Sequence, residues 1–421
     1  MIAAVLDKKR FAFFYNKLKC CAQHRSEEAL LLLWVATQLP PVVDCGVVVS
    51  FGKGEDGQLG HGDAESCAMP QPVKALRGKA ISSVSCGAEY SIAVSHETRQ
   101  VYSWGWGDFG RLGHGHSLDC FSPQPITALS GVAVRQVACG DAHTLVATEA
   151  GELYAFGRNQ NGQLGVGSTE DVLAPRRVDA LADVNVISVS AGAEHSVVAT
   201  SGGQVYSFGW GKYGCLGDGS REDRHVPTLT KGLEGVHVAQ VACGWRHSIA
   251  VTDNHRIYTF GWGRFGQIGH GDNEDRLTAA EVTPLAHVAI KRVAGGWRHT
   301  AALDADGRCY TWGWGKFGQL GLGDDRDRNA PTLVATLDGR HAVLVACGWR
   351  HTVVTTADGA IGDPAAAAHA PLVTPADRFA VVPEEGAAGG GGGAHDGAGG
   401  GSTAARKKPR LDESDAAVPG C

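Results

Sequence analysis

The chain has 421 residues, of which 43% are hydrophobic and 19% charged, with a formal net charge of -6. The apolar share suffices for a large core, and the negative charge argues against bulk electrostatic binding to nucleic acid. Glycine is the outlier, with 59 residues, well above its usual share. The 12 cysteines are scattered without a CxxC motif or a disulfide framework, which favours a reducing cytosol or nucleus.

Residues 1–46 match no other part of the chain. Their one apolar stretch, residues 29–39, is too short to span a bilayer and lies too far from the N-terminus for an ordinary signal peptide. We therefore expect no membrane anchor.

From residue 47 the chain is built of repeats that carry two markers. The first, an aromatic residue followed by a glycine-rich loop, recurs in steps of 53, 52, 52, 52 and 52 residues, beginning at Phe51, Trp104, Phe156, Phe208, Phe260 and Trp312. The second reads GAEYS, GDAHT, GAEHS, GWRHS, GWRHT and GWRHT, beginning at Gly87, Gly140, Gly192, Gly244, Gly296 and Gly348. Short alternating segments such as VYSFGW and HSIAVT predict several strands in each repeat.

The repeats predict an all-β fold, a β-propeller over residues 47–359 with six countable repeats. The recurring aromatics are expected in the core of every blade. The glycine-rich loops read as turns rather than phosphate sites, because no Walker lysine or helix follows them. One histidine per repeat is expected to be a structural hydrogen-bonder, and no catalytic or metal-binding constellation is visible: His143, His195, His247, His299 and His351.

Residues 360–421 predict a flexible tail, because two runs rich in glycine lie within it. The basic run RKKPR, residues 406–410, fits nuclear import as well as plain solvated charge. We expect the protein in both the cytoplasm and the nucleus.

Residues that differ between repeats divide one face of the predicted propeller. Two residues after the second-marker glycine stand Glu89, Ala142, Glu194, Arg246, Arg298 and Arg350. One residue after it stand Ala88, Asp141, Ala193, Trp245, Trp297 and Trp349. Three residues after the first glycine of the glycine-rich loops stand Glu55, Asp108, Gln160, Lys212, Arg264 and Lys316. The first half is acidic and the second basic and aromatic, so a two-fold axis would make the face self-complementary, as in a salt-sensitive homodimer.

Three tryptophans of this face directly precede an arginine. Arginine over indole is favourable, and the plain interpretation is a set of interface anchors. Indole also absorbs UV-B, and an excited indole can pass charge to its surroundings. The sequence therefore permits a dimer that light breaks.

The repeats resemble the regulator-of-chromosome-condensation family of propellers. The GWRHS, GWRHT, GWRHT triplet, with WGWGDFGRLGHG from Trp104 and FAVVPEE from Phe379, resembles more narrowly the plant and algal UV-B photoreceptors of the UV-resistance-locus type. The resemblance implies seven blades, a dark homodimer and no external chromophore or other cofactor. It also implies UV-B-induced monomers that bind a photomorphogenesis-repressing E3 ubiquitin ligase.

The resemblance also implies roles for residues. Trp245 and Trp297 would be the main sensing tryptophans and Trp349 a supporting one, next to the cations Arg246, Arg298 and Arg350. The dimer interface is expected to include Glu89, Trp106, Asp108, Asp119, Asp141, Arg158, Glu194, Lys212 and Lys316. In the tail, Val382 and Pro383 would dock on the WD40-type propeller of the ligase.

Several alternatives stay open at the level of the sequence. Strands near residues 343–356 could pair with residues 47–51 and close a ring of six blades, or the ring could be imperfect and lack one repeat. A propeller of this kind could also be a guanine-nucleotide exchange factor for a small GTPase, or a scaffold in contact with chromatin or transcription factors. The exchange factor leaves the acidic-to-basic order unexplained, and the scaffold predicts indifference to light. None of these readings involves a membrane or a small-molecule substrate.

Overall fold

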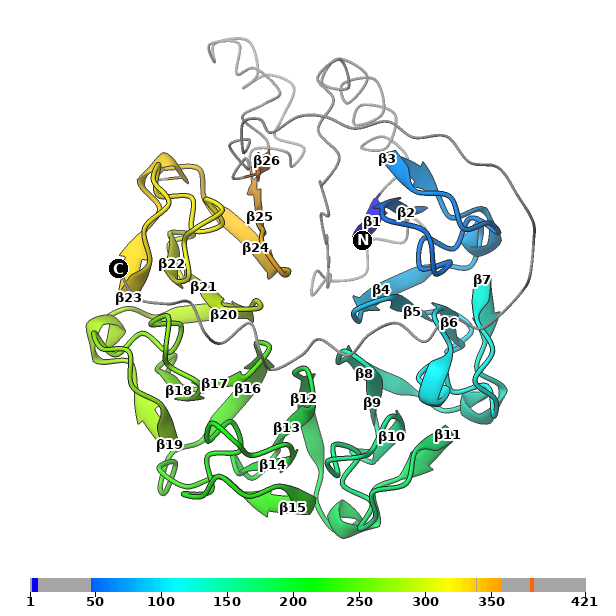
Figure 1. Cartoon of the computed structure of the whole chain (residues 1–421), viewed down its shortest axis with the longest axis horizontal. Coiled ribbons are helices and arrows are strands. Elements are labelled where there is room, and N and C mark those ends of the chain that lie inside the picture. Colours follow the sequence, from blue (N-terminus) through cyan, green and yellow to red (C-terminus); the bar gives the residue numbers. More distant parts are fainter. Residues whose placement is uncertain (1, 7–46, 338, 358–378, 382–421) are drawn as a thin grey trace, which may run out of the picture. The chain divides into compact units, whose positions relative to one another are not determined.

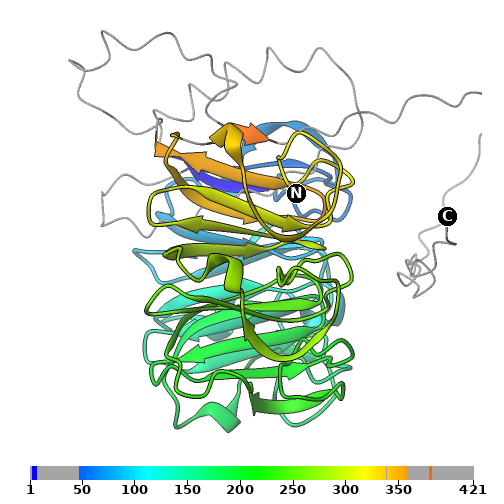
Figure 2. The ribbon, with the colours of Figure 1, turned by 90° about the vertical axis from the view of Figure 1, so that its left-hand side faces the viewer.

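A computed structural model describes residues 2–6, 47–337, 339–357 and 379–381 of the chain. These residues form seven antiparallel sheets, in which the strands follow one another in chain order. Each sheet is a blade, numbered 1 to 7 from the N-terminal side. The blades follow one another around a ring (Figure 1), and the view turned by 90° shows their strands running roughly along the ring axis (Figure 2). The all-β propeller is confirmed.

Blades 2 to 6 have four strands each. Blade 2 contains β4 (Ile81–Cys86), β5 (Tyr90–Ser95), β6 (Val101–Gly105) and β7 (Cys120–Pro125). Blade 3 contains β8 (Val134–Cys139), β9 (His143–Thr148), β10 (Leu153–Gly157) and β11 (Val172–Arg177). Blade 4 contains β12 (Val186–Ala191), β13 (His195–Thr200), β14 (Val205–Gly209) and β15 (Arg224–Leu229). Blade 5 contains β16 (Val238–Cys243), β17 (His247–Thr252), β18 (Ile257–Gly261) and β19 (Arg276–Glu281). Blade 6 contains β20 (Ile290–Gly295), β21 (His299–Asp304), β22 (Cys309–Gly313) and β23 (Arg328–Leu333).

Blades 1 and 7 have three strands each among the described residues. Blade 1 contains β1 (Ile2–Leu6), β2 (Val47–Gly52) and β3 (Cys67–Pro72), and blade 7 contains β24 (Ala342–Cys347), β25 (Thr352–Thr356) and β26 (Phe379–Val381). Short 3₁₀ helices of the described residues lie in the connections: η1 (Lys74–Leu76), η2 (Asp108–Gly110), η3 (Thr127–Leu129), η4 (Asp179–Leu181), η5 (Thr283–Leu285) and η6 (Ala335–Leu337). None of these helices has the length and apolarity needed to span a bilayer.

The two three-stranded blades explain why six copies of each marker accompany seven sheets. Blade 1 carries a glycine-rich loop but no second marker, and the described part of blade 7 carries a second marker but no glycine-rich loop. Ring closure by pairing residues 343–356 with residues 47–51 is wrong. Strand β2 pairs with β1 and β3, and β25 pairs with β24 and β26, so these segments lie in different sheets. Strands β1 and β26 satisfy backbone groups that six-blade closure would have paired.

The hydrophobic core lies between neighbouring blades. Each of six buried clusters joins one blade to the next, from blades 1 and 2 to blades 6 and 7. Because both faces of a blade are covered, its second strand is buried along its whole length in blades 2 to 6. Of the six recurring aromatics, Phe51 is only partly buried, and five are fully buried: Trp104, Phe156, Phe208, Phe260 and Trp312.

Buried histidines link the blades by hydrogen bonds, as expected from the sequence. The Nε2 atom of each lies 2.9 to 3.0 Å from a hydroxyl of the next blade, in the pairs His143–Ser196, His195–Ser248, His247–Thr300 and His299–Thr352. Burial lowers the pKa of His143 and His247 to about 3 and that of His195 and His299 to about 4. These imidazoles are therefore neutral and structural, and they form the inter-blade histidine links named below.

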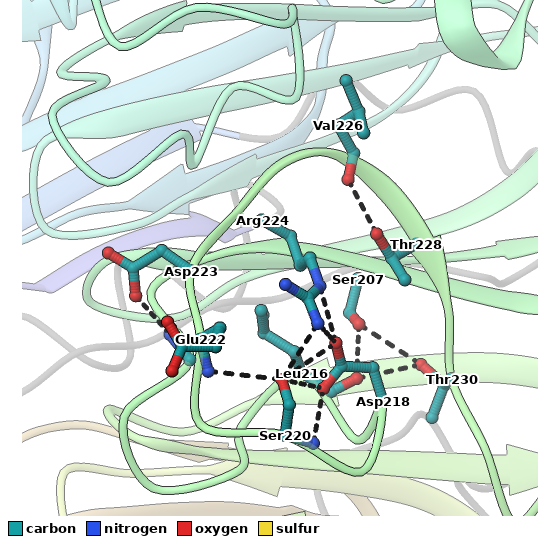
Figure 3. Close-up of polar contacts among 11 residues, drawn as sticks. Ser207, Leu216, Asp218, Ser220, Glu222, Asp223, Arg224, Val226, Thr228 and Thr230 are labelled. Atoms are coloured by element: carbon teal, nitrogen blue, oxygen red, sulfur yellow. Dashed lines mark hydrogen bonds and ion pairs between the residues drawn. The ribbon is translucent and has the colours of Figure 1, made fainter.

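An ion pair with a buried carboxylate closes the glycine-rich loop of blade 4. Asp218 lies 2.7 Å from Arg224 of β15 and accepts hydrogen bonds of 2.9 Å from the backbone N–H and the hydroxyl of Ser220 (Figure 3). Burial alone would raise the pKa of Asp218, but the bonds from Ser220 and the charge of Arg224 outweigh it and lower the pKa. The loop is thereby fixed to the outer strand of its own blade.

Candidate functional site

Both markers lie on one face because a backbone hydrogen bond joins them in every complete blade. The residue two after the second-marker glycine offers its carbonyl to the N–H of the residue two after the loop aromatic. The distances are 2.8 to 2.9 Å for Trp106–Glu89, Arg158–Ala142, Trp210–Glu194, Trp262–Arg246 and Trp314–Arg298. The side chains that the sequence singled out are therefore presented together, and we call this surface the marker face.

Five tryptophans of blades 5 to 7 form one connected cluster on the marker face. The ring centroids of Trp245 and Trp297 are 5.4 Å apart, and those of Trp297 and Trp349 are 5.1 Å apart at an interplanar angle of 88°. Trp262 lies 5.9 Å from Trp245, and Trp314 lies 5.3 Å from Trp297. All four separations are within the range of favourable aromatic pairs. Trp297 thus occupies the centre, in contact with three other indoles.

Arginine guanidinium groups lie over these rings. The Cζ atom of Arg298 is 3.7 Å from the centroid of Trp297, and that of Arg246 is 3.8 Å from the centroid of Trp245. Arg350 lies 4.5 Å from Phe317 and 5.6 Å from Trp349, a ring that is 46% exposed. The three Trp-Arg pairs of the sequence are therefore cation–π contacts within one chain. Tyr213 and Phe265, which sequence reasoning left out, connect the indoles of successive loops, and Phe317, also left out, packs against Trp314.

The acidic half of the face is partly neutralised within the chain. Arg158 and Glu194 form an ion pair of 3.2 Å, and Glu89 lies 3.9 Å from Lys53. Both members of the Arg158–Glu194 pair are more than a quarter exposed, which leaves them accessible to a second molecule. Asp108 is exposed at the tip of its loop.

Asp141 connects the acidic half to the tryptophan cluster through a side-chain hydrogen bond with Trp245. Burial, assisted by the nearby charge of Glu194, raises the pKa of Asp141 to about 6, while Arg111, Trp245 and Arg246 oppose the shift. Asp141, an acidic residue predicted for the dimer interface, thus contacts a predicted sensing tryptophan.

Asp119 has a role in its own loop that the sequence did not reveal. Its Oδ1 atom accepts the backbone N–H of Gly107 at 2.8 Å. The same bond recurs in blades 3 to 6 at 2.8 to 3.1 Å, with the acceptors Asp171, Asp223, Asp275 and Asp327. A residue that recurs in this way shapes the loop of each of these blades.

The basic half projects its cations into solvent. Lys212, Arg264 and Lys316 are exposed at the tips of their loops, beside the half-buried aromatic rings. Arg221 joins two of these loops, since it lies 3.0 Å from Asp275 and donates to the carbonyl of Lys212. Val382 and Pro383, predicted to bind a ligase, lie outside the described residues.

Arg111 is a further residue of the face that sequence reasoning missed. It is 1% exposed, and its Cζ atom lies 3.9 Å from the ring centroid of Trp106. The sequence did contain a signal for Arg111. It departs from the repeat, because glutamine stands at the equivalent position in four of the six loops. No group of histidine, cysteine and acidic side chains suited to a metal occurs in the described part of the chain.

Comparison with known proteins places this architecture in a family. The family model of the RCC1-like domain matches residues 48–362. The chain is 51% identical over 310 residues to the Ultraviolet-B receptor UVR8 of Arabidopsis thaliana, covering 74% of this chain and 70% of that protein. This chain is a UVR8-type member of the RCC1-like family.

More distant relatives share the RCC1-like repeats. Human E3 ubiquitin-protein ligase HERC2 is 36% identical over 312 residues, which are 73% of this chain but only 6% of HERC2. Among solved structures, human WBSCR16 matches with a TM-score of 0.66 at 27% identity, covering 73% of this chain and 80% of that one. Yeast RCC1 (Prp20), solved bound to Kap60, matches with a TM-score of 0.66 at 24% identity over 74% of this chain and 77% of its own. At that identity the likeness shows the RCC1-like fold alone.

Proposed function

We propose that this chain is a UV-B receptor that absorbs light through its own tryptophans. The observation that carries the proposal is the cluster in which Trp297 touches Trp245 and Trp349 while Arg298 lies 3.7 Å from its ring. The identity of 51% to the receptor UVR8 supports the same role. No external chromophore or other cofactor is needed, because indole itself absorbs in the UV-B.

In this proposal the marker faces of two copies meet in the dark. The acidic residues Glu89, Asp108 and Glu194 of one copy would face the basic half of the other, with Arg246, Arg298, Arg350, Lys212 and Lys316. Trp106, Asp119, Asp141 and Arg158 would complete the interface. Exposed ion pairs contribute about 0 to 1 kcal/mol each, so such a dimer depends on many of them at once and is breakable.

Light would act on the ion pairs through the cation–π contacts. Excitation of Trp297 raises the energy of an electron that the adjacent Arg298 guanidinium can accept. The transferred electron neutralises the guanidinium and leaves the positive charge on the indole as a radical cation, so the guanidinium loses its attraction for a carboxylate across the interface. Because the stacked rings are half-buried, little water is present to screen the change. The dimer would then separate.

The monomer would signal through an E3 ubiquitin ligase, with Val382 and Pro383 as the docking element in the tail. The ligase context is supported by relatives such as HERC2, whose own name is that of an E3 ubiquitin-protein ligase. The basic run at residues 406–410 would allow entry into the nucleus from the cytoplasm. The alternative of a guanine-nucleotide exchange factor gains nothing from yeast RCC1, since the likeness is one of fold.

The test is size-exclusion chromatography of the purified chain, kept dark or given UV-B. We expect a dark dimer that becomes monomeric on illumination and a Trp297→Phe variant that stays dimeric in both conditions. Trp312→Phe is the matched control, because it removes a fully buried tryptophan at a position where other blades carry phenylalanine. A Trp297→Phe variant that monomerises like the wild type would contradict the assignment, and a wild type indifferent to UV-B would end the proposal.

A further inference from the structure

The tight turn in the glycine-rich loop of blade 2 differs from those of the other blades. Phe109 has φ 62° and ψ 4°, and the N–H of Gly110 donates to the carbonyl of Gly107, as expected when Phe109 is the third residue of a type II turn. The third residue of such a turn is usually glycine, because a side chain at positive φ is strained. The equivalent residues of the five other loops have no positive φ: Asp56, Asn161, Tyr213, Phe265 and Phe317.

A change of donor for acceptor accounts for the different turn. In four of the other five loops a glutamine Oε1 accepts the N–H of the third turn residue at 2.9 to 3.0 Å, from Gln58, Gln163, Gln267 and Gln319, and the loop of blade 4 has Cys215 at this position. Blade 2 has Arg111 there, and a guanidinium only donates. Its Nε atom donates to the carbonyl of Asp108 at 3.0 Å, so the peptide between Asp108 and Phe109 is reversed.

The same guanidinium holds the surroundings of the turn. Its Nη1 atom donates to the carbonyl of Asp141 in blade 3 at 3.2 Å, and its Cζ atom lies 3.9 Å from the Trp106 ring and 5.5 Å from the Phe109 ring. A second cation also contacts this ring: the Cζ atom of Arg158 lies 5.4 Å from the centroid of the Phe109 ring. One buried cation therefore fixes the backbone beneath Asp108, an indole beside it and the next blade.

Strain in a loop that the fold repeats elsewhere without strain points to a function of that loop. We propose that Arg111 is a positioning residue that selects the type II turn and thereby directs the Asp108 carboxylate and the Trp106 indole toward a second copy of this chain. The inference rests on the proposed function, because it takes the marker face as the dimer contact. It adds a buried residue that would not touch the partner and would still set the geometry of the acidic half.

The experiment compares the dark dimer dissociation constants of the full chain by analytical ultracentrifugation. We expect Arg111→Gln to raise the dimer Kd at least tenfold, with an unchanged Tm, because four other loops fold with glutamine at this position. Asp108→Asn should raise the Kd as well, and the double variant should be no weaker than the weaker single variant, since both changes remove one contact. Arg111→Lys keeps a donor and the charge and should restore part of the affinity.

The control is Gln163→Leu, which removes the turn-holding side chain in blade 3, where the uncharged Gln160 stands at the tip. An Arg111→Gln dimer as tight as the wild type, or effects of Arg111→Gln and Asp108→Asn that simply add, would overturn the inference. Amide hydrogen exchange at Phe109, measured on the monomer, tests the turn itself. Exchange should slow in Arg111→Gln, because the introduced amide oxygen would accept that N–H, and an unchanged rate would contradict the reversal. If the wild type has no dark dimer, the proposed function is wrong and the exchange rate alone decides the turn.

Discussion

Arg298 lies within 6.0 Å of five aromatic ring centroids, those of Trp245, Trp262, Phe265, Trp297 and Trp314. A guanidinium that stacks by its face still has donors along its edge, so the same group can bind a carboxylate in its own plane. Excitation of an indole would therefore reach an ion pair through one side chain. Lysine, a compact point charge, lacks this combination of stacking and bidentate donation.

Replacing Arg298 with alanine tests this double role. We expect the dark dimer Kd of Arg298→Ala to rise about tenfold to a hundredfold, because a cation–π contact and a charge-assisted hydrogen bond are lost together. Analytical ultracentrifugation measures the change. Arg256→Ala serves as the control, since Arg256 pairs with Glu281 at the end of β18 away from the markers. A fully dimeric Arg298→Ala protein at moderate salt would remove Arg298 from the interface.

The carboxyl group of Asp141 makes the stability of the folded chain depend on pH. Its pKa of about 6 in the folded chain exceeds the value of about 4 in the unfolded chain, so ionisation costs the fold stability as the pH rises from 4 to 6. We expect Asp141→Asn to stabilise the monomer at pH 8 by up to about 3 kcal/mol, with a gain that vanishes near pH 4. Urea unfolding at both pH values measures it, and an equal difference at pH 4 and pH 8 would show that Asp141 does not titrate in this range.

At the scale of the elements, the inter-blade histidine links join strands that share no sheet. Each histidine of a second strand bonds a hydroxyl of the next second strand, 53 residues on, and the pattern holds in four successive junctions. The hydrophobic clusters between the same blades exclude water from these bonds. Registration between blades thus depends on polar contacts inside an apolar interface.

These histidines make the propeller sensitive to acid. Their folded-state pKa values of about 3 to 4 lie below the unfolded value of about 6.5, so the unfolded chain takes up protons first. The stability that they provide is complete above pH 6.5 and is lost as the pH falls toward 4. His247→Gln should reduce the slope of unfolding free energy against pH, near pH 5, by about 1.4 kcal/mol per pH unit, one proton. Equal slopes in the wild type and in His247→Gln would contradict the assignment.

At the scale of the whole molecule, one kind of interaction stabilises the ring and another kind would stabilise the proposed dimer. Buried apolar clusters join the blades, whereas charged side chains at the surface carry the marker face. Salt screens exposed charges but leaves buried apolar contacts almost unaffected. The two interactions should therefore respond differently to ionic strength.

A salt series tests this separation. Between about 0.05 and 0.5 M NaCl the dark dimer Kd should rise at least tenfold, because the Debye length falls from about 14 to 4 Å. The thermal unfolding of the monomer should change little over the same range. Lys316→Glu, which places a negative charge in the basic half, should weaken the dimer at low salt and lose most of that effect at high salt. A dimer that tightens with salt would indicate an apolar interface instead.

The sequence by itself determined the propeller, the recurring core aromatics and the alignment of Trp245, Trp297 and Trp349 next to arginines, because these properties repeat with the period of the blade. The third strand of the first and last sheets came from residues 2–6 and 379–381, whose pairing partners lie far away in the chain. The loop-capping bond of Asp119 and the reversed peptide at Phe109 also appeared only in three dimensions. A charge in a sequence has a sign but no partner, and only tertiary structure decides which backbone N–H or carbonyl stands opposite a given side chain.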